Sequence, residues 1–272
     1  MAMCTYHPDR ETYRSCSRCG NPACHDCLVD APVGAQCRSC VKASRPSTTQ
    51  QMKANLRQPT LVTQVLLVSF LVIFVLSGST GMSGGISPLH QRFALNAADV
   101  RNGEWWRIIT CGFLHFGIIH LLFNGWAMWN VGQALERGLG RWRFVGLFLV
   151  SVIGGSAGAL LLEPRALTAG ASGGLFGLFA AGFMGSRARN IPFAASGWGP
   201  TLLMNLVFTV SIPGISIGGH LGGATAGALA GSVLMGRRSL IGAKAARDRQ
   251  DLIVLVAVGL LAFVVALFAA YR

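Results

Sequence analysis

Acidic residues are scarce in this chain of 272 residues, which has 10 Asp and Glu against 23 Lys and Arg. Half of its residues are hydrophobic (52%), and its mean hydropathy of +0.51 is too high for an ordinary soluble domain. The chain also lacks an apolar region at its start, where Met1-Ala2-Met3 leads directly to Cys4, so we expect no secretory signal peptide there. These absences exclude the common classes of soluble and secreted proteins.

Long apolar segments occupy most of the remaining chain. A transmembrane helix needs about 20 mainly apolar residues, and the sequence predicts seven such spans: about 60–78, 107–134, 143–162, 172–186, 194–211, 216–236 and 252–270. The predicted fold class is therefore an all-α polytopic membrane protein.

The excess of basic residues agrees with this topology and does not require a nucleic-acid partner. Basic loops at 137–143, 187–189 and 237–249 alternate with connections at 79–104, 163–169 and 212–217 that contain few Lys or Arg. Because cytoplasmic loops carry most of the basic residues in membrane proteins, we expect residues 1–57 to be cytoplasmic and the second group of connections to face outward.

Seven of the eight cysteines lie between residues 4 and 40, and the eighth, Cys111, lies in an apolar segment. Together with one histidine they form four pairs with two intervening residues: Cys4/His7, Cys16/Cys19, Cys24/Cys27 and Cys37/Cys40. Eight ligands at this spacing suit two tetrahedral zinc ions. Disulfides are the alternative, but they require an oxidising compartment, and the expected cytoplasmic location favours zinc.

The cysteine-rich segment, residues 1–41, is too poor in large apolar residues to fold around a core, so we expect metal binding to supply much of its stability. Its ligand order resembles a B-box-like zinc module. This resemblance implies crossed pairing, with Cys4, His7, Cys24 and Cys27 on one ion and Cys16, Cys19, Cys37 and Cys40 on the other, although two sequential sites would give a similar pattern. His25 is expected to be solvated. Residues 42–57 have the composition of a flexible linker.

Two glycine-rich motifs open the fourth and sixth spans. Gly170-Ala171-Ser172-Gly173 precedes one apolar helix and Gly219-His220-Leu221-Gly222-Gly223 begins the other, so the predicted topology places Ser172 and His220 at one depth. A lone membrane serine usually serves packing. Here, however, small residues recur every fourth position, as Gly219, Gly223, Gly227 and Gly231 on the sixth span and as Gly173 and Gly177 on the fourth. Such stripes allow helices to approach closely enough for a Ser–His contact.

These motifs resemble those of the rhomboid family of intramembrane serine proteases. The resemblance covers about residues 58–237 and implies Ser172 as nucleophile and His220 as general base. It also implies that His120 and Asn124, which follow His115 on the second span, form the oxyanion hole. Further residues match family positions near the site or in the first outer loop: Gly170, Gly173, Phe176, Gly223, Gly227, Trp106 and Arg107. Phe176 stands where family members often carry tyrosine. Phenylalanine at this position keeps the packing against the histidine but lacks the hydroxyl.

The expected architecture is a rhomboid-like six-helix bundle, followed by a basic loop and a seventh transmembrane helix in residues 238–272 and preceded by the zinc module. The few carboxylates beyond the first outer loop, Glu136, Glu163, Asp248 and Asp251, offer no clear third member of a triad, so a Ser–His dyad is expected. The resemblance implies a multi-pass protease of the bacterial cytoplasmic membrane with its active site toward the outer face.

The expected substrates are transmembrane proteins, and the zinc module is expected to bind a cytoplasmic protein and not nucleic acid. One alternative is an inactive rhomboid-like scaffold that binds membrane clients; such a scaffold would be expected to lack the serine or the histidine. A second alternative, which the sequence favours less, is a small-solute transporter with His115, His120 and Asn124 along its pathway.

Overall fold

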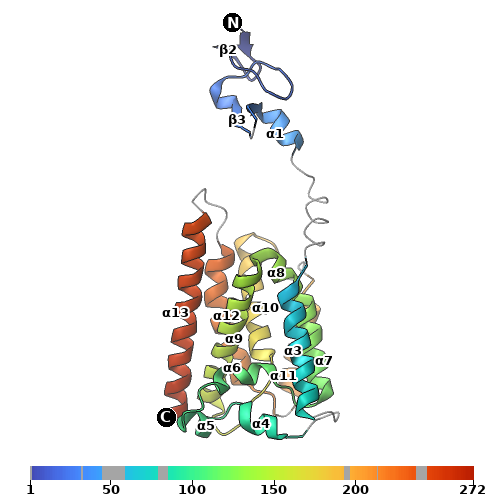
Figure 1. Cartoon of the computed structure of the whole chain (residues 1–272), viewed down its shortest axis with the longest axis vertical. Coiled ribbons are helices and arrows are strands. Elements are labelled where there is room, and N and C mark those ends of the chain that lie inside the picture. The colour runs from blue at the N-terminus through green and yellow to red at the C-terminus, as the bar shows by residue number, and fades with distance from the viewer. Residues whose placement is uncertain are drawn as a thin grey trace. The chain divides into compact units, whose positions relative to one another are not determined.

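The computed structural model describes residues 2–31, 33–44, 59–78, 85–192, 197–212, 214–236 and 244–272. It divides into two compact units, Met1–Gln58 and Pro59–Arg272, which are considered separately (Figure 1). The predicted linker at 42–57 falls largely outside the described residues, because only its first three positions belong to a described helix.

The N-terminal unit is built from two small hairpins and a short helix. Strands β1 (Ala2–Cys4) and β2 (His7–Thr12) pair antiparallel, and so do β3 (Leu28–Asp30) and β4 (Ala35–Cys37). A 3₁₀ turn, η1 (His25–Cys27), precedes β3, and helix α1 (Arg38–Ser44) follows β4. The buried residues of this unit are mainly cysteines, in agreement with the predicted lack of an apolar core.

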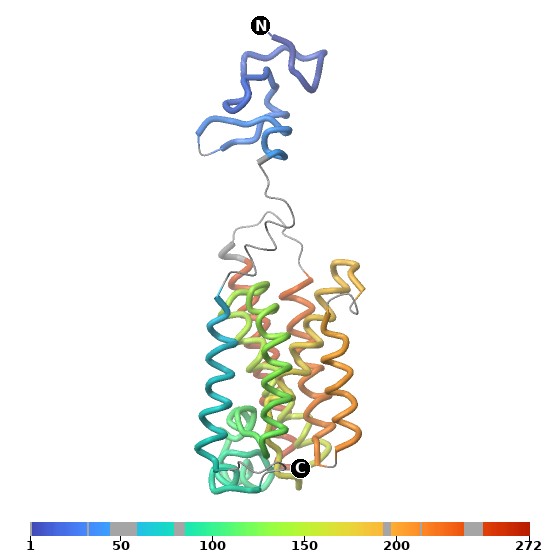
Figure 2. The backbone as a smooth tube through the Cα atoms, turned by 90° about the vertical axis from the view of Figure 1, so that its right-hand side faces the viewer, coloured from blue at the N-terminus to red at the C-terminus, as the bar shows by residue number. Residues whose placement is uncertain are grey.

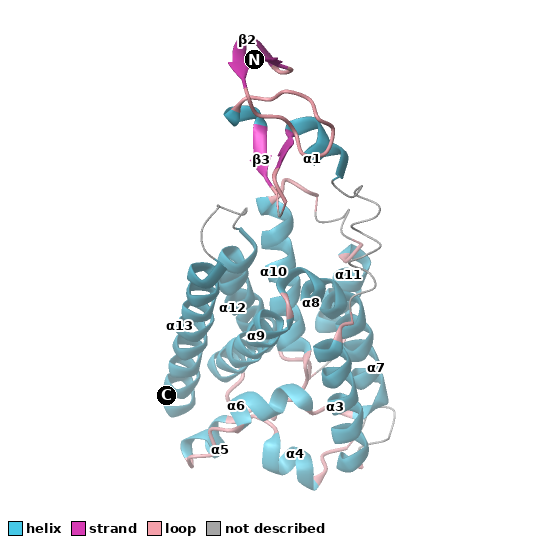
Figure 3. Cartoon of the chain, turned by 45° about the horizontal axis from the view of Figure 1, so that its top comes forward, coloured by secondary structure: helices cyan, strands magenta, loops and turns pink. Residues whose placement is uncertain are grey.

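The described secondary-structure elements of the second unit are helices, apart from one isolated β-bridge, and its long helices run alongside one another (Figures 2 and 3). Its helices are α3 (Leu61–Ser77), α4 (Pro88–Phe93), α5 (Ala97–Arg101), α6 (Arg107–Thr110), η2 (Cys111–Phe113), α7 (Gly117–Ala127), η3 (Met128–Gly132), α8 (Gln133–Leu139), α9 (Arg141–Leu162), α10 (Ser172–Ala188), α11 (Gly199–Ser211), α12 (Ile217–Gly236) and α13 (Lys244–Tyr271).

The predicted helical membrane fold class is confirmed. In the described residues, α9 and residues Arg247–Tyr271 of α13 are each long and apolar enough to cross a membrane, and a bent pair formed by Arg107–Phe113 and Gly117–Leu139 could add a third span. Helices α3 and α11 are apolar but shorter. Helices occupy all seven predicted positions; that each one crosses the membrane stays a prediction.

The predicted second span, 107–134, is not one continuous helix. The chain bends by 92° between Phe113 and Gly117, so that the helical segment formed by α6 and η2 is almost perpendicular to α7. Gly117 has a φ of +77°, a conformation that favours glycine and permits the turn. The helix then continues through η3, a π-helical turn, to Leu139. His115 consequently lies in the bend and not on the helix with His120.

Glycines bring α10 and α12 into backbone contact, as their spacing predicts. A Cβ atom on Gly223 would lie 2.0 Å from the carbonyl oxygen of Gly173, and one on Gly227 would lie 2.2 Å from that of Gly177. The opposite side of α12 meets α9 in the same way, where a Cβ atom on Gly222 would lie 2.2 Å from the Gly154 carbonyl oxygen. Helix α12 is thus held tightly between two neighbours.

Helix α13 is attached to the rest of its unit by polar contacts near both ends. Near its beginning, Asp248 and the buried Asp251 pair with Arg143 of α9, with 2.7 Å between Arg143 Nε and Asp251 Oδ2. At its end, Arg101 Nη1 donates to the Ala270 carbonyl (3.0 Å), and the Tyr271 hydroxyl donates to the Arg101 carbonyl (3.2 Å). These contacts fix the seventh helix beside α9.

Candidate active site and metal sites

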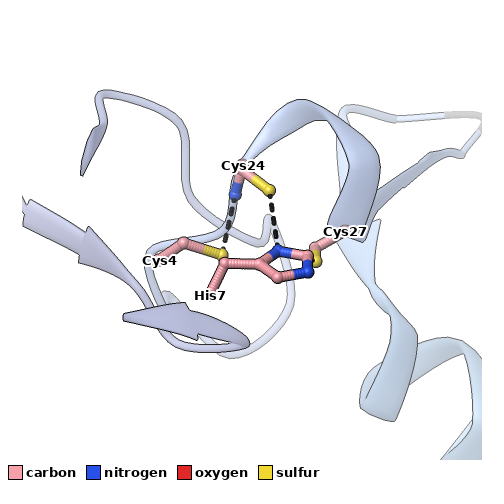
Figure 4. A group of neighbouring side chains, drawn as sticks. All are labelled: Cys4, His7, Cys24 and Cys27. Carbon is pink, nitrogen blue, oxygen red and sulfur yellow. Dashed lines mark hydrogen bonds between the residues drawn. The ribbon is translucent and has the colours of Figure 1, made fainter. Parts of the chain in front are cut away.

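Two groups of four ligand residues form in the N-terminal unit, and both follow the crossed pairing. Each group places its ligand atoms within 4.8 Å of one another. The first contains Cys4, His7, Cys24 and Cys27 (Figure 4), and the second contains Cys16, Cys19, Cys37 and Cys40. Each group could hold a metal ion. His25 lies outside both groups and is exposed, as predicted.

The geometry of these groups fits a tetrahedral metal. The Sγ atoms of Cys19 and Cys37 are 3.7 Å apart, close to the roughly 3.8 Å expected between two sulfurs that each lie about 2.3 Å from a tetrahedral zinc ion. None of the eight cysteines forms a disulfide. Backbone N–H groups point at two of the sulfurs: Cys24 donates to Cys4 Sγ and Cys37 to Cys16 Sγ, both at 3.2 Å. Such donors stabilise thiolates that bind metals.

Ser172 and His220 meet at one end of the helix bundle, as their motifs predict. The Ser172 hydroxyl lies 2.8 Å from His220 Nε2, a hydrogen-bonding distance. Ser172 is the first residue of α10, and His220 belongs to the first turn of α12. The backbone contacts between these helices hold the two side chains together, and His220 is buried.

Thr209 of α11 is a third member of this hydrogen-bond chain that the sequence did not reveal. Its Oγ1 lies 2.8 Å from His220 Nδ1 and 2.6 Å from the Asn205 carbonyl oxygen. The carbonyl can only accept, so the threonine proton is donated to it and Oγ1 accepts from Nδ1–H. His220 is therefore protonated on Nδ1 and presents the Nε2 lone pair to the Ser172 hydroxyl.

The ring of Phe176 covers one face of the His220 imidazole. The two rings are stacked, with 4.1 Å between their centroids and 13° between their planes. The predicted packing of phenylalanine at this position is thus seen in the structure. Stacking and the Thr209 hydrogen bond together restrict the rotation of His220.

His120 reaches the same site from α7. Gly170 has a φ of +139°, and a Cβ atom at this position would lie 2.7 Å from His120 Nε2 and 3.7 Å from Ser172 Oγ. Glycine therefore allows the imidazole to lie against the backbone just before the serine. The His115 ring contacts the His120 ring edge-to-face (centroids 5.2 Å apart), and neither His115 nitrogen has a hydrogen-bond partner in the described part of the chain.

A cavity of about 480 Å³ joins these side chains. Ser172, His220, His120 and Asn124 all line it, and its remaining wall is largely apolar, with Phe116, Ile119, Phe208, Ile212 and Ile215. Asn124 donates one amide hydrogen to the His120 carbonyl (3.0 Å), which leaves its second N–H unassigned. Polar groups thus converge in an apolar pocket of the size that encloses a small peptide segment.

No carboxylate among the described residues contacts His220. Glu163 instead contacts the start of α12: it accepts from the Ser216 hydroxyl and from Gly218 N–H (3.2 Å). Ser216 Oγ in turn accepts from Gly219 N–H (2.8 Å). Sequence distance suggested no connection between Glu163 and the site, yet this carboxylate caps the helix that carries the histidine.

Trp106 and Arg107 do not line the pocket, and their contacts join the segment between α3 and α7. The buried Arg107 guanidinium contacts Glu104 (2.6 Å) and Asp99 (3.2 Å) and donates to the Ala94 carbonyl (2.6 Å). Trp106 Nε1 donates to the Arg92 carbonyl (3.4 Å). These contacts are consistent with the structural role that the resemblance implies.

Known proteins share the part of the chain that builds this site. The Rhomboid domain model matches residues 102–237, which is half of the chain. Rhomboid protease GluP of Bacillus subtilis (strain 168) is 32% identical over 183 residues, which cover 65% of this chain and 35% of GluP. YdcA of the same strain is 48% identical over 81 residues, or 29% of this chain and 41% of YdcA.

A plant protein gives a similar result. RHOMBOID-like protein 5 of Arabidopsis thaliana is 33% identical over 157 residues, which cover 55% of this chain and 50% of that protein. The chain thus spans a third to a half of the length of these relatives. The residues that the domain model matches include Ser172, His220, His120 and Asn124 and do not include the cysteine-rich unit. The chain belongs to the rhomboid family.

Proposed function

We propose that the chain is an intramembrane serine endopeptidase that hydrolyses peptide bonds in or near transmembrane segments. The observation that supports this most directly is the 2.8 Å contact between Ser172 Oγ and His220 Nε2 inside a cavity of a membrane-spanning fold. A serine hydroxyl is a weak nucleophile unless a neighbouring base takes its proton. The Nε2 lone pair, oriented by Thr209, is such a base.

The reaction follows from this geometry. Ser172 Oγ attacks the carbonyl carbon of the scissile bond while His220 Nε2 takes the hydroxyl proton. The tetrahedral intermediate collapses as His220 gives that proton to the leaving amine, which leaves an acyl ester on Ser172. A water molecule, deprotonated by His220, then attacks the ester carbonyl. As this second intermediate collapses, His220 returns the proton to Ser172 Oγ, which releases the carboxylic acid and restores the free serine.

The oxyanion formed in each step needs hydrogen-bond donors close to Ser172. Ser172 lies at the beginning of α10, where the first backbone N–H groups have no intrahelical partner. The positive end of the helix dipole also favours negative charge there. The His120 imidazole and the second Asn124 N–H are the side-chain donors that line the same cavity. Together these groups form the proposed oxyanion hole.

The substrates in this proposal are transmembrane proteins, and the protein acts in a cell membrane. The apolar wall of the cavity suits a segment that leaves the hydrocarbon region. The distribution of Lys and Arg supports a cytoplasmic N-terminus and an active site toward the outer face, which in a bacterium would be the outer face of the cytoplasmic membrane.

Labelling with a serine-reactive fluorophosphonate tests the proposal. The purified chain should be labelled and should cleave a transmembrane substrate, whereas Ser172→Ala should do neither. Ser232→Ala is the matched control, because this serine lies on the exposed side of α12 and bonds only within its helix (2.8 Å to the Leu229 carbonyl). A client-binding scaffold or a transporter would not be labelled at Ser172. Absence of this labelling would therefore exclude the proposal.

We also propose that both N-terminal ligand groups bind zinc. Seven cysteine ligands with one histidine favour zinc over harder metals, and four ligands per ion leave no position for a catalytic water. Zinc would therefore replace the missing apolar core and hold the hairpins together. A compact cytoplasmic adaptor for a protein partner is the role that fits best, since Asp9, Glu11, Asp26 and Asp30 balance Arg10, Arg14, Arg18 and Arg38.

Metal analysis of the full-length protein should find two zinc ions per chain. His7→Ala should reduce this number by weakening the first group, because three ligands bind less tightly than four. His25→Ala should retain both ions, since His25 lies outside the groups. Protein that contains no zinc when purified under reducing conditions would exclude this assignment.

A further inference from the structure

Arginines gather at the end of the bundle that carries Ser172, where the charge distribution predicts few. Arg101, Arg165 and Arg272 line a single cavity of about 420 Å³, although they are far apart in the sequence. Helix α5 supplies the first, the connection after α9 the second, and the end of α13 the third. Three like charges around one cavity repel one another, and an anion bound there would reduce this repulsion.

The carboxylates closest in sequence to Arg101 and Arg165 already bind other groups. Asp99 pairs with Arg107 and contacts Asn96, and Glu163 caps α12 through Ser216 and Gly218. None of the cavity arginines has an ion-pair partner in the part of the chain that the structure describes. Arg101 uses one N–H for the Ala270 carbonyl and retains four others. The cavity therefore carries positive charge that no described side chain neutralises.

The remaining wall of the cavity is apolar. Ala97, Leu160, Leu161, Pro164 and Ala269 form it. The cavity lies where α9 and α13 end, and these are the two described helices long enough to cross a membrane. Most of α13 is exposed, including Leu260, Leu261, Val264 and Phe268, so its surface faces lipid in a membrane protein. A ligand here would meet arginines at the membrane interface and apolar side chains below them.

We propose that this cavity binds the phosphodiester headgroup of an anionic phospholipid in the leaflet on the Ser172 side. Guanidinium groups bind phosphate oxygens in pairs, and the acyl chains would lie along the exposed face of α13. The bound lipid would link α5, α9 and α13 at the membrane surface. Because the cavity is separate from Ser172, the site can exist whether or not the protein is a protease.

Native mass spectrometry of the full chain in detergent tests this site. Phosphatidylglycerol should remain bound at concentrations at which phosphatidylcholine, which has no net charge, is lost. Arg165→Gln and the triple variant Arg101→Gln/Arg165→Gln/Arg272→Gln should weaken phosphatidylglycerol binding by about tenfold or more, as expected when charged hydrogen bonds are lost. Arg165 is the principal single variant, because its side chain forms no ion pair within the described residues.

Arg92→Gln is the matched control, since Arg92 belongs to the same end of the bundle but does not line the cavity. It should retain phosphatidylglycerol. Equal retention of both lipids, or unchanged binding in Arg165→Gln, would overturn the proposal. Inorganic phosphate at millimolar concentration tests whether the cavity binds a soluble anion instead of a lipid headgroup. If phosphate displaces phosphatidylglycerol completely and raises the thermal midpoint as much as phosphatidylglycerol does, the cavity binds a soluble anion and the lipid assignment is wrong.

Discussion

A histidine that acts as general base must present an unprotonated nitrogen to its nucleophile. In serine proteases with a triad, an aspartate enforces this tautomer by accepting from the other nitrogen. Thr209 has the corresponding position here, because its hydroxyl donates to the Asn205 carbonyl and can only accept from His220 Nδ1. A neutral acceptor orients the imidazole but stabilises the imidazolium less than a carboxylate would.

Thr209→Val tests this role, since valine has nearly the same shape and lacks the hydroxyl. Loss of one orienting hydrogen bond should lower kcat by about tenfold, with a smaller change in KM because Thr209 need not contact the substrate. Thr209→Ser keeps the hydroxyl and should retain most of the activity. Equal kcat values for the valine variant and the unmodified protein would mean that stacking on Phe176 is sufficient to orient His220.

The contact between Ser172 and His220, the proposed nucleophile and base, was expected from the sequence, whereas that of Thr209 was not. Ser172 and His220 each stand in a glycine-rich motif at one predicted depth, and rare polar residues in apolar helices attract attention. Threonine is common in membrane helices, where it usually bonds within its own helix. Its contact with His220 depends on how α11 packs on α12, and no local sequence pattern in α11 predicts that packing.

At the scale of helices, the glycines of α12 determine how near His220 comes to Ser172. Gly227→Ala should destabilise the protein, because the added methyl would lie 2.2 Å from the carbonyl oxygen and 2.3 Å from the Cα atom of Gly177. Backbone atoms cannot move aside cheaply, and overpacking of this kind typically costs about 1–3 kcal/mol. Activity should fall together with the thermal midpoint in detergent.

Gly259→Ala is the control for this prediction. Gly259 lies within the apolar part of α13, where an added methyl would meet only Val150 Cγ2 at 3.4 Å. This substitution should be neutral or should stabilise the helix by up to about 1 kcal/mol, since alanine favours helices over glycine. If both variants unfold at the same temperature as the unmodified protein, the contact between α10 and α12 is looser than the structure shows.

The boundaries of the helices were predictable where apolar segments are continuous, as in α3, α9, α10 and α12. The bend before Gly117 was not predicted, because Leu114 to Phe116 keeps the composition of a membrane segment while the backbone changes direction. The cause is tertiary: the His115 carbonyl accepts from His90 Nε2 (3.2 Å), and Gly117 permits the turn. The capping of α12 by Glu163 depends on a similar long-range contact.

At the scale of the whole molecule, the sequence predicted two parts with different sources of stability. The membrane unit relies on helix packing and the N-terminal unit on ligand groups that can bind metal. The crossed arrangement of these groups was left open by spacing, because sequential and crossed sites use the same pairs of residues. The fold of the two hairpins and the turn at η1 brings the first pair of ligands next to the third. It also brings the second pair next to the fourth.

Since the chain divides into two compact units and the proposed site lies within the second, removal of the first should leave the proposed chemistry intact. Deletion of residues 1–41 should leave kcat unchanged for a generic transmembrane substrate in detergent, because every residue of the proposed site lies beyond residue 110. The thermal midpoint of the membrane unit should also stay the same. In cells, the same deletion should reduce cleavage of those substrates that a cytoplasmic adaptor recruits.

Zinc chelation of the full-length protein provides a second way to disable the N-terminal unit. It should release two zinc ions and unfold that unit, because the unit has no apolar core to replace the metal. Cleavage in detergent should continue at the original rate. If either deletion or chelation abolishes cleavage while the membrane unit still melts at its normal temperature, the N-terminal unit is required for catalysis and is more than a recruiting module.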